Sequence, residues 1–226
     1  MLTRILAGGL IGGIAGGIVV GAIESVTTTP LILQAEQFEV KHVASAAQIL
    51  LVHSSDHGAA AGGGDATRTL LTFAATILVA VGYVWMLLAA MFAKGEAITA
   101  RSVIPWAVAG FFVTGLAPAL GLAPELPGSA AADLEARQFW WIGTAAATAL
   151  GLAAIFFGRG VVWTVVGIGL IVLPHVIGAP RPDEMASLVP AELAAEFVSA
   201  SLVVQALIWI VPAVIAGYAI QRFRSA

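Results

Sequence analysis

Histidine and acidic side chains gather in one polar segment of this 226-residue chain, between Glu24 and Arg68. Three of the four histidines lie in that segment. Imidazole and carboxylate groups are common protein ligands of divalent cations such as Co²⁺, Ni²⁺ and Zn²⁺. The chain has no cysteine, so disulfides and thiolate metal sites are excluded, and a metal must bind through nitrogen, oxygen or methionine sulfur.

The most compact ligand set in this segment is His53, Asp56 and His57. If the chain makes a helical turn there, two imidazoles and a carboxylate can share one divalent cation. The alternative is a solvated loop, because polar residues beside the glycine-rich run at 58–64 also serve solubility. The spacing therefore predicts a cation capture site and leaves the solvated loop open.

A helix is predicted just before that set, from Leu31 to Val52, since Thr29 can cap its start and Pro30 suits its first turn. Its apolar residues indicate that it lies on the membrane or against a helical bundle. Residues three apart on a helix share a face. A second set of candidate ligands is therefore expected on one face of this helix: Glu36, Glu39 and His42.

Two further ionisable residues, Glu24 and His175, lie near the ends of apolar stretches. An ionisable group at membrane depth is costly and usually faces the protein interior or a wet cavity. We expect both at similar depth, where each can partner the other; the alternative is contact with interfacial water. Pro174 has no N–H for the Leu170 carbonyl, so it predicts a broken helix whose carbonyls can meet a cation, or an ordinary helix end.

Six apolar stretches must position these residues, and each is about 17 to 24 residues long, enough for a helix to cross a bilayer core. With 60% hydrophobic and 10% charged residues, the composition excludes disordered and nucleic-acid-binding classes. We predict one all-α domain, a polytopic integral membrane helical bundle in contact with lipid. The expected spans are about 5–23, 69–92, 103–122, 139–157, 161–177 and 202–220.

Only Gly158-Arg159-Gly160 separates the fourth and fifth stretches. Arg159 favours a hairpin of two helices, because a charge costs several kcal/mol at mid-membrane and little at the interface. One kinked element, giving five spans, is the alternative. In the six-span arrangement the side with both termini carries six of the ten Lys and Arg residues and one acid, Glu96, so both termini are predicted to be cytoplasmic.

Glycines form two adjacent rows on the first span, at 8, 12 and 16 and at 9, 13, 17 and 21. Such GxxxG rows let another helix approach closely in lipid. Packing within the chain is the main expectation, and an oligomer through this span is the alternative. A signal peptide is disfavoured, because the following residues, 24–27, contain no small-x-small cleavage site.

Enzymatic activity is not expected, because the chain contains no GxSxG elbow, Walker A loop, HExxH pair or dinucleotide fingerprint. Haem-linked or quinone-linked electron transfer is disfavoured as well. Haem needs histidines that face one another within the spans, and only His175 lies near the membrane. We therefore expect no permanently bound cofactor and no nucleic-acid partner.

Three segments of the chain resemble the CbtA family of predicted cobalt transporter subunits found in bacteria. They are the glycine-rich first span with 29–36 (TPLILQAE), 173–180 (LPHVIGAP) and 191–197 (AELAAEF). The resemblance implies cobalt uptake across the bacterial inner membrane, linked to cobalamin synthesis, with a small one-span histidine-containing partner subunit (CbtB). Members are described with about five spans, whereas six stretches occur here.

The sequence thus predicts a membrane subunit that takes up a divalent cation, cobalt. The loop site around His53 would capture the cation, the helix site around Glu36 would hold it next, and Glu24 with His175 would start the membrane pathway. The alternative is a structural or partner-docking membrane subunit without its own ion pathway.

Overall fold

The computed structural model describes residues 2–50, 64–183 and 186–225. This part of the chain consists of helices and their connections and contains no strand, which confirms the predicted all-α fold. The elements in chain order are α1 (Leu2–Val26), α2 (Thr28–Leu50), α3 (Gly64–Ala93), α4 (Val103–Phe111), the π-helical segment η1 (Phe112–Leu116), α5 (Ala117–Ala119), α6 (Leu134–Phe157), α7 (Val161–Ile177) and α8 (Ala191–Ser225).

Four of these helices, α1, α3, α6 and α8, are long and apolar enough to cross a membrane. Two shorter apolar helices occupy the places of the third and fifth predicted spans: Val103–Ala119, which includes η1, and Val161–Ile177. The fourth and fifth predicted spans are separate helices, α6 and α7. They are joined by a tight turn in which Gly160 adopts a φ of 87°, a conformation that disfavours side chains with a Cβ.

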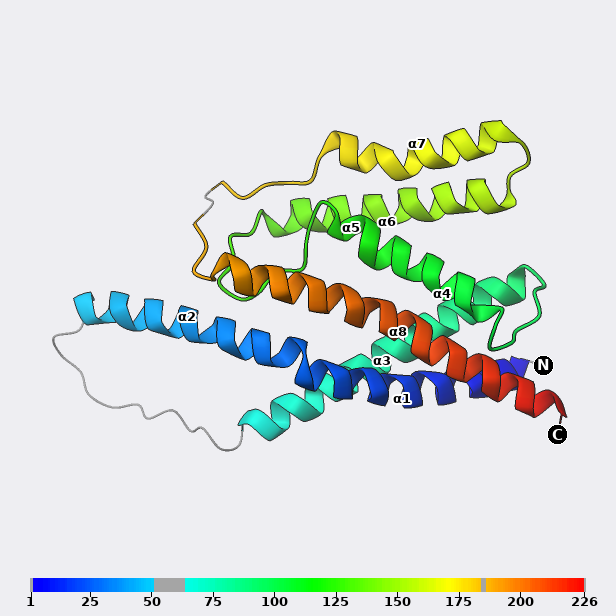
Figure 1. Cartoon of the computed structure of the whole chain (residues 1–226), viewed down its shortest axis with the longest axis horizontal. Helices are drawn as coiled ribbons and strands as arrows, with labels where there is room; N and C mark the ends of the chain where they lie inside the picture. Colours follow the sequence, from blue (N-terminus) through cyan, green and yellow to red (C-terminus); the bar gives the residue numbers. More distant parts are fainter. Residues whose placement is uncertain (1, 51–63, 184–185, 226) are drawn as a thin grey trace.

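The helices run along the long axis of the molecule, and both termini lie at one end (Figure 1). We call this the terminal end; it also carries the α3–α4 and α6–α7 connections. The opposite end, the loop end, carries α2 and the connections that lead into α6 and α8. The arrangement places on one end the loops that the charge pattern assigned to one side of the membrane.

The glycine rows of α1 contact two different helices. A Cβ at Gly16 would lie 2.5 Å from the Cα of Pro212 in α8. A Cβ at Gly17 would lie 2.7 Å from the Cα of Ile77 in α3. Backbones this close have no room for a side chain, so α1 packs between α3 and α8 through glycine, as small-residue rows do in lipid. Both rows are therefore used within one chain.

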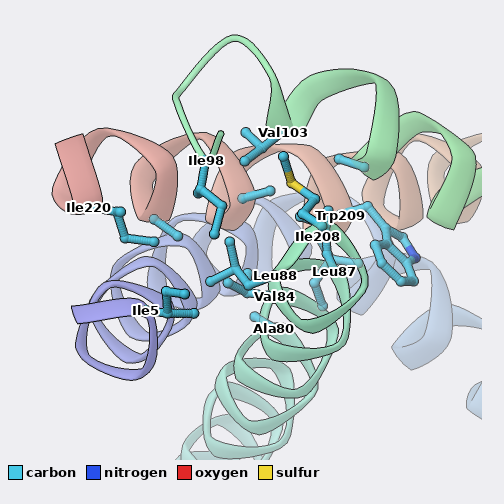
Figure 2. Close-up of a cluster of buried hydrophobic side chains, with 14 of the residues drawn as sticks. Ile5, Ala80, Val84, Leu87, Leu88, Ile98, Val103, Ile208, Trp209 and Ile220 are labelled. Carbon is cyan, nitrogen blue, oxygen red and sulfur yellow. The ribbon is translucent and has the colours of Figure 1, made fainter. Parts of the chain in front are cut away.

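The main hydrophobic core lies where α1, α3 and α8 meet, toward the terminal end (Figure 2). Leu88 and Met91 of α3 are fully buried there. The connection before α4 closes this core, since Ile98 is 1% exposed and packs with Ile5 and Ile220. Protein contacts, rather than lipid, thus bury the large side chains on the facing sides of these three helices.

A second core at the loop end fixes α2. Its first half buries Leu31 and Ala35 against Leu193 and Phe197 of α8. The 35 residues of α8 would measure about 52 Å, more than the roughly 30 Å of a bilayer core. The helix starts at Ala191, before the predicted sixth span, and its first turns pack on α2. The prediction that α2 lies against the bundle is confirmed for this half.

The α6–α7 hairpin forms a unit at the edge of the bundle (Figure 1). Its helices touch at glycine, since a Cβ at Gly151 would lie 2.6 Å from the carbonyl oxygen of Gly167. The packing of α7 is mainly against α6. The helix continues through Pro174 and ends at Ile177, so of the two alternatives at Pro174 the structure shows the ordinary helix end and not the break. Trp140 Nε1 donates to the Pro174 carbonyl at 3.3 Å, which anchors this helix end on α6.

Candidate functional site

A cavity of about 340 Å³ lies between α1, α3, η1, α6 and α8. Apolar and aromatic side chains form most of its wall, including Trp141 and Ile208. A few polar groups converge on it from four of the five elements: Glu24, Thr76, Tyr83, Thr114 and Gln205. Pockets of this size with few convergent polar groups are the usual form of small-ligand sites. It is the candidate functional site of this protein.

Glu24 supplies the negative charge of the cavity from the last turns of α1. Its Oε2 accepts a hydrogen bond from Thr76 Oγ1 at 2.6 Å, and Thr76 is buried in α3. This bond fixes one carboxylate oxygen. Its other oxygen makes no hydrogen bond to the described part of the chain and is free to meet a ligand.

The end of α1 that carries Glu24 is held by hydroxyl groups. Ser25 Oγ donates to the Ala22 carbonyl and Thr27 Oγ1 donates to the Ile23 carbonyl, both at 2.7 Å. Thr28 Oγ1 donates to the Glu24 carbonyl at 3.4 Å as α2 begins. These bonds satisfy carbonyls that a helix end leaves without donors. Residues 27–30 (TTTP) thus fix the end of α1, which carries the Glu24 carboxylate, at the point where α2 begins.

The π-helical segment η1 carries Thr114 into the cavity wall. In an α-helix the N–H of residue 118 would donate to the Thr114 carbonyl, but Pro118 has no N–H. The Ala117 N–H donates to the Phe112 carbonyl, five residues back, which is the π-helical pattern. Thr114 Oγ1 donates to the Gly110 carbonyl at 3.0 Å. Such π-segments often occur at functional sites.

Two stacked aromatic rings close the cavity toward the terminal end. Tyr83 and Trp209 stack with ring centroids 4.2 Å apart and planes 12° apart. Trp209 Nε1 donates to Thr114 Oγ1 at 2.9 Å, which ties the stack to η1. A Cβ at Gly110 would lie 2.4 Å from the Trp209 ring, so this ring position requires glycine there.

Gln205 lies in the cavity wall, but its carboxamide oxygen is not open to the cavity. Its Oε1 is buried and has no hydrogen-bond partner. A Cβ at Gly115 would lie 2.5 Å from this oxygen, so the oxygen rests directly on the glycine of η1. The cavity offers one carboxylate and the hydroxyls of Thr76, Thr114 and Tyr83, which can attract a cation. No cluster of three or more His, Cys, Asp or Glu side chains exists among the described residues.

Among the predicted site residues, Glu36 and Glu39 lie at the loop end, outside this cavity. Arg68 binds both oxygens of Glu36, with Nη2–Oε1 2.6 Å and Nη1–Oε2 2.8 Å. The hydrogen bonds from Arg68, reinforced by its charge, lower the pKa of Glu36 against the opposing effect of burial. Glu39 packs beside Gly128, where a Cβ would lie 3.1 Å from its Cγ. Both of these α2 acids thus make contacts with other parts of the chain.

His175 lies at the end of α7 and not beside Glu24. Its ring meets Trp140 edge-on, with centroids 5.7 Å apart. Its Nε2 is buried without a hydrogen-bond partner. Within the described chain, no hydrogen bond or ion pair joins His175 to Glu24, because one lies on the outer hairpin and the other lines the cavity. The expected partnership of these two residues is therefore absent.

The remaining predicted ligands fall outside the described residues. His53, Asp56 and His57 lie within 51–63, and the side chain of His42 is likewise not described. Their role in capturing a cation stays a prediction.

Sequence reasoning missed most of the cavity wall. Thr76, Thr114 and Gln205 are neutral polar residues inside apolar stretches, where the predicted site residues were ionisable ones. A polar carboxamide within a membrane helix is itself a signal, because an unpaired polar group is costly in hydrocarbon. Gln205 could have been found in this way, whereas its convergence with Glu24 depends on tertiary packing.

Comparison with known proteins identifies the family of this chain. No curated protein and no solved structure was found that matches the chain. A family model described as "Probable cobalt transporter subunit (CbtA)" matches residues 2–221, nearly the whole chain, including every residue of the cavity wall. This protein belongs to the CbtA family of probable cobalt transporter subunits.

Proposed function

We propose that this protein is the membrane subunit of a cobalt uptake system and that its cavity is a station for the cation within the membrane. One observation carries the proposal: the Glu24 carboxylate, with one oxygen free, lines a cavity between helices together with Thr76, Thr114 and Gln205. Ionisable groups at membrane depth commonly mark ion pathways. Membership of the family supplies cobalt as the substrate.

The charges at the two ends predict the orientation of the chain in the membrane. The terminal end carries Arg4 near the N-terminus, Lys94 and Arg101 in the α3–α4 connection, and Arg159 in the α6–α7 connection. Under the positive-inside rule, this end faces the cytoplasm of a bacterial inner membrane. The loop end, with most of the acids, then faces outward. A cation would reach the cavity from the loop end, and the membrane potential would favour its passage inward.

The Tyr83–Trp209 stack would hold the cavity closed on the cytoplasmic side. Passage requires the two rings to separate, and Trp209 would then lose its bond to Thr114. The hydrogen bond joins this ring to η1, so a shift of the π-helical segment would move the closure.

We also propose that the transported cobalt serves cobalamin synthesis and that a small one-span histidine-containing subunit works with this chain. The His53, Asp56 and His57 set would gather the cation before it enters. Glu36 is a weaker candidate ligand, because Arg68 already binds both of its oxygens. No permanently bound cofactor and no catalytic step are needed for this function.

The proposal is tested by radioactive cobalt uptake in cells that express this chain with and without the small partner. Uptake above that of empty cells, dependent on this chain, is the expected result. If the partner alone gives the full uptake, the chain has no ion pathway of its own and acts as a structural or docking subunit.

A further inference from the structure

The ligand chemistry of the cavity restricts the cation that it can hold. The ligand atoms that its polar groups offer are oxygens alone: those of the Glu24 carboxylate and of the hydroxyls of Thr76, Thr114 and Tyr83. The indole N–H of Trp209 is only a donor and already bonds to Thr114. The residues that line the cavity include no histidine, cysteine or methionine. Oxygen ligands favour hard cations such as Mg²⁺ and Mn²⁺ and give no preference for softer ones.

The volume of the cavity suits a hydrated cation. Six waters take up about 180 Å³, at about 30 Å³ each in the liquid. That is well below the 340 Å³ available in the cavity. A site with one carboxylate cannot replace the whole hydration shell of a divalent cation, and Mg²⁺ sites of this kind keep several waters. The cation therefore has both the room and the need to keep most of its shell.

The free oxygen of Glu24 fits this mode of binding. Thr76 fixes the other oxygen, so a water of the cation's shell can donate to the free one. The carboxamide of Gln205 lines the same cavity, with its oxygen buried against Gly115. Weak binding of this kind lets an ion leave as well as enter, as conduction requires.

Building on the proposed function, we propose that Glu24 holds the divalent cation through its own water shell, beside Gln205 in the cavity wall. The station then accepts hydrated divalent cations as a class, Mn²⁺ and Mg²⁺ together with Co²⁺. Selectivity for cobalt must be set at another step, such as capture in the loop or by a partner.

An exchange-inert mimic tests this directly. Hexaamminecobalt(III) resembles a hydrated metal ion in size and in its outward N–H donors, and it cannot exchange its ligands for protein groups. Chain-dependent radioactive cobalt uptake is measured in right-side-out membrane vesicles, with increasing hexaamminecobalt(III) or Mn²⁺. Both are expected to inhibit. The inhibition should persist in the variant with His42, His53 and His57 changed to Ala, because that variant leaves the described cavity wall intact.

Substitution of Gln205 gives the second arm. Gln205→His adds a nitrogen ligand, so it should raise the Mn²⁺ needed for half inhibition by about tenfold or more, because nitrogen ligands bind Mn²⁺ less tightly than Co²⁺. Gln205→Leu should lower uptake without changing that preference. Gln34→Leu, on the exposed face of α2, is the matched control and should behave as wild type.

The outcomes separate the two proposals. Absence of chain-dependent cobalt uptake overturns the proposed function. Strong uptake that neither hexaamminecobalt(III) nor Mn²⁺ inhibits overturns the hydrated-cation station alone, because the ion must then shed its shell for ligands that distinguish cobalt. An unchanged Mn²⁺ preference in an active Gln205→His variant also contradicts it, since Gln205 would then not face the ion.

Discussion

Replacement of Gly16 by Ala tests whether close packing of α1 holds the bundle together. The added Cβ would lie 2.5 Å from the Cα of Pro212 and 2.5 Å from its Cγ. Real Cβ atoms do not approach a backbone atom so closely, and Pro212 lies inside α8, where it cannot swing away. Helices α1 and α8 must therefore move apart along this contact.

The size of the effect follows from two opposing terms. Overpacking of a well-packed interior costs about 1 to 3 kcal/mol. Replacing glycine by alanine within a helix returns about 0.5 to 1 kcal/mol, because alanine loses less backbone entropy. We therefore expect Gly16→Ala to lower the free energy of unfolding by about 1 kcal/mol, the middle of the range of about 0 to 2.5 kcal/mol that the two terms allow.

The matched control is Gly82→Ala in α3, where a Cβ would meet no atom within 4 Å. Thermal unfolding of both variants in the same detergent is followed by circular dichroism. The control should be as stable as wild type or slightly more stable, while Gly16→Ala melts earlier. Equal stability of the two variants would show that α1 and α8 do not pack as closely as described.

Three other predictions concern the loop end and the outer hairpin. Changing His53, Asp56 and His57 together to Ala should raise the cobalt concentration for half-maximal uptake with normal expression; unchanged uptake at limiting cobalt would leave them a solvated loop. His175→Ala should leave maximal uptake unchanged, because its ring packs on Trp140 away from the cavity; a lower maximal rate at equal protein level would place it in the pathway after all. Arg68→Gln should cost about 0.2 to 1 kcal/mol of stability at pH 7, because both partners of its ion pair are partly exposed. Arg68 depresses the pKa of Glu36 in the folded state, so this stabilisation is complete above the unfolded pKa, about 4.3, and is lost as the pH falls through the folded pKa. Denaturation of wild type and variant at several pH values checks this, and a difference that stays constant down to pH 2 would contradict it.

Much of the fold could be predicted because the bilayer simplifies the rules. Spans must be apolar helices, so each of the six apolar stretches predicted a helix at the right place, and the charge of Arg159 correctly separated α6 from α7. The full length of a helix was not predicted where it extends beyond its apolar stretch. The first turns of α8 contain Glu192 and Glu196 and look like a loop by hydropathy, yet packing on α2 extends the helix through them.

The candidate site was predictable only in part. Glu24 was identified because a carboxylate at membrane depth is costly. The groups around it were not, because Thr76, Thr114 and Gln205 come from three distant segments and meet only through packing. The effect of proline on a helix could not be predicted from the sequence. Pro174 allowed either a break or an ordinary helix end, and the helix simply ends after it, whereas Pro118 accompanies the π-helical segment that carries Thr114.

The most direct test of the central claim is cobalt uptake by Glu24→Gln. Glutamine keeps the size of the side chain and an oxygen that can accept from Thr76, so the change removes little besides the charge. At an effective dielectric constant near 20, two unit charges 4 Å apart attract by about 4 kcal/mol, so uptake at limiting cobalt should fall by more than about tenfold. Glu196→Gln, on an exposed turn of α8, is the matched control and should transport normally. Wild-type uptake by Glu24→Gln at equal protein level would show that the cavity is not the station for the cation.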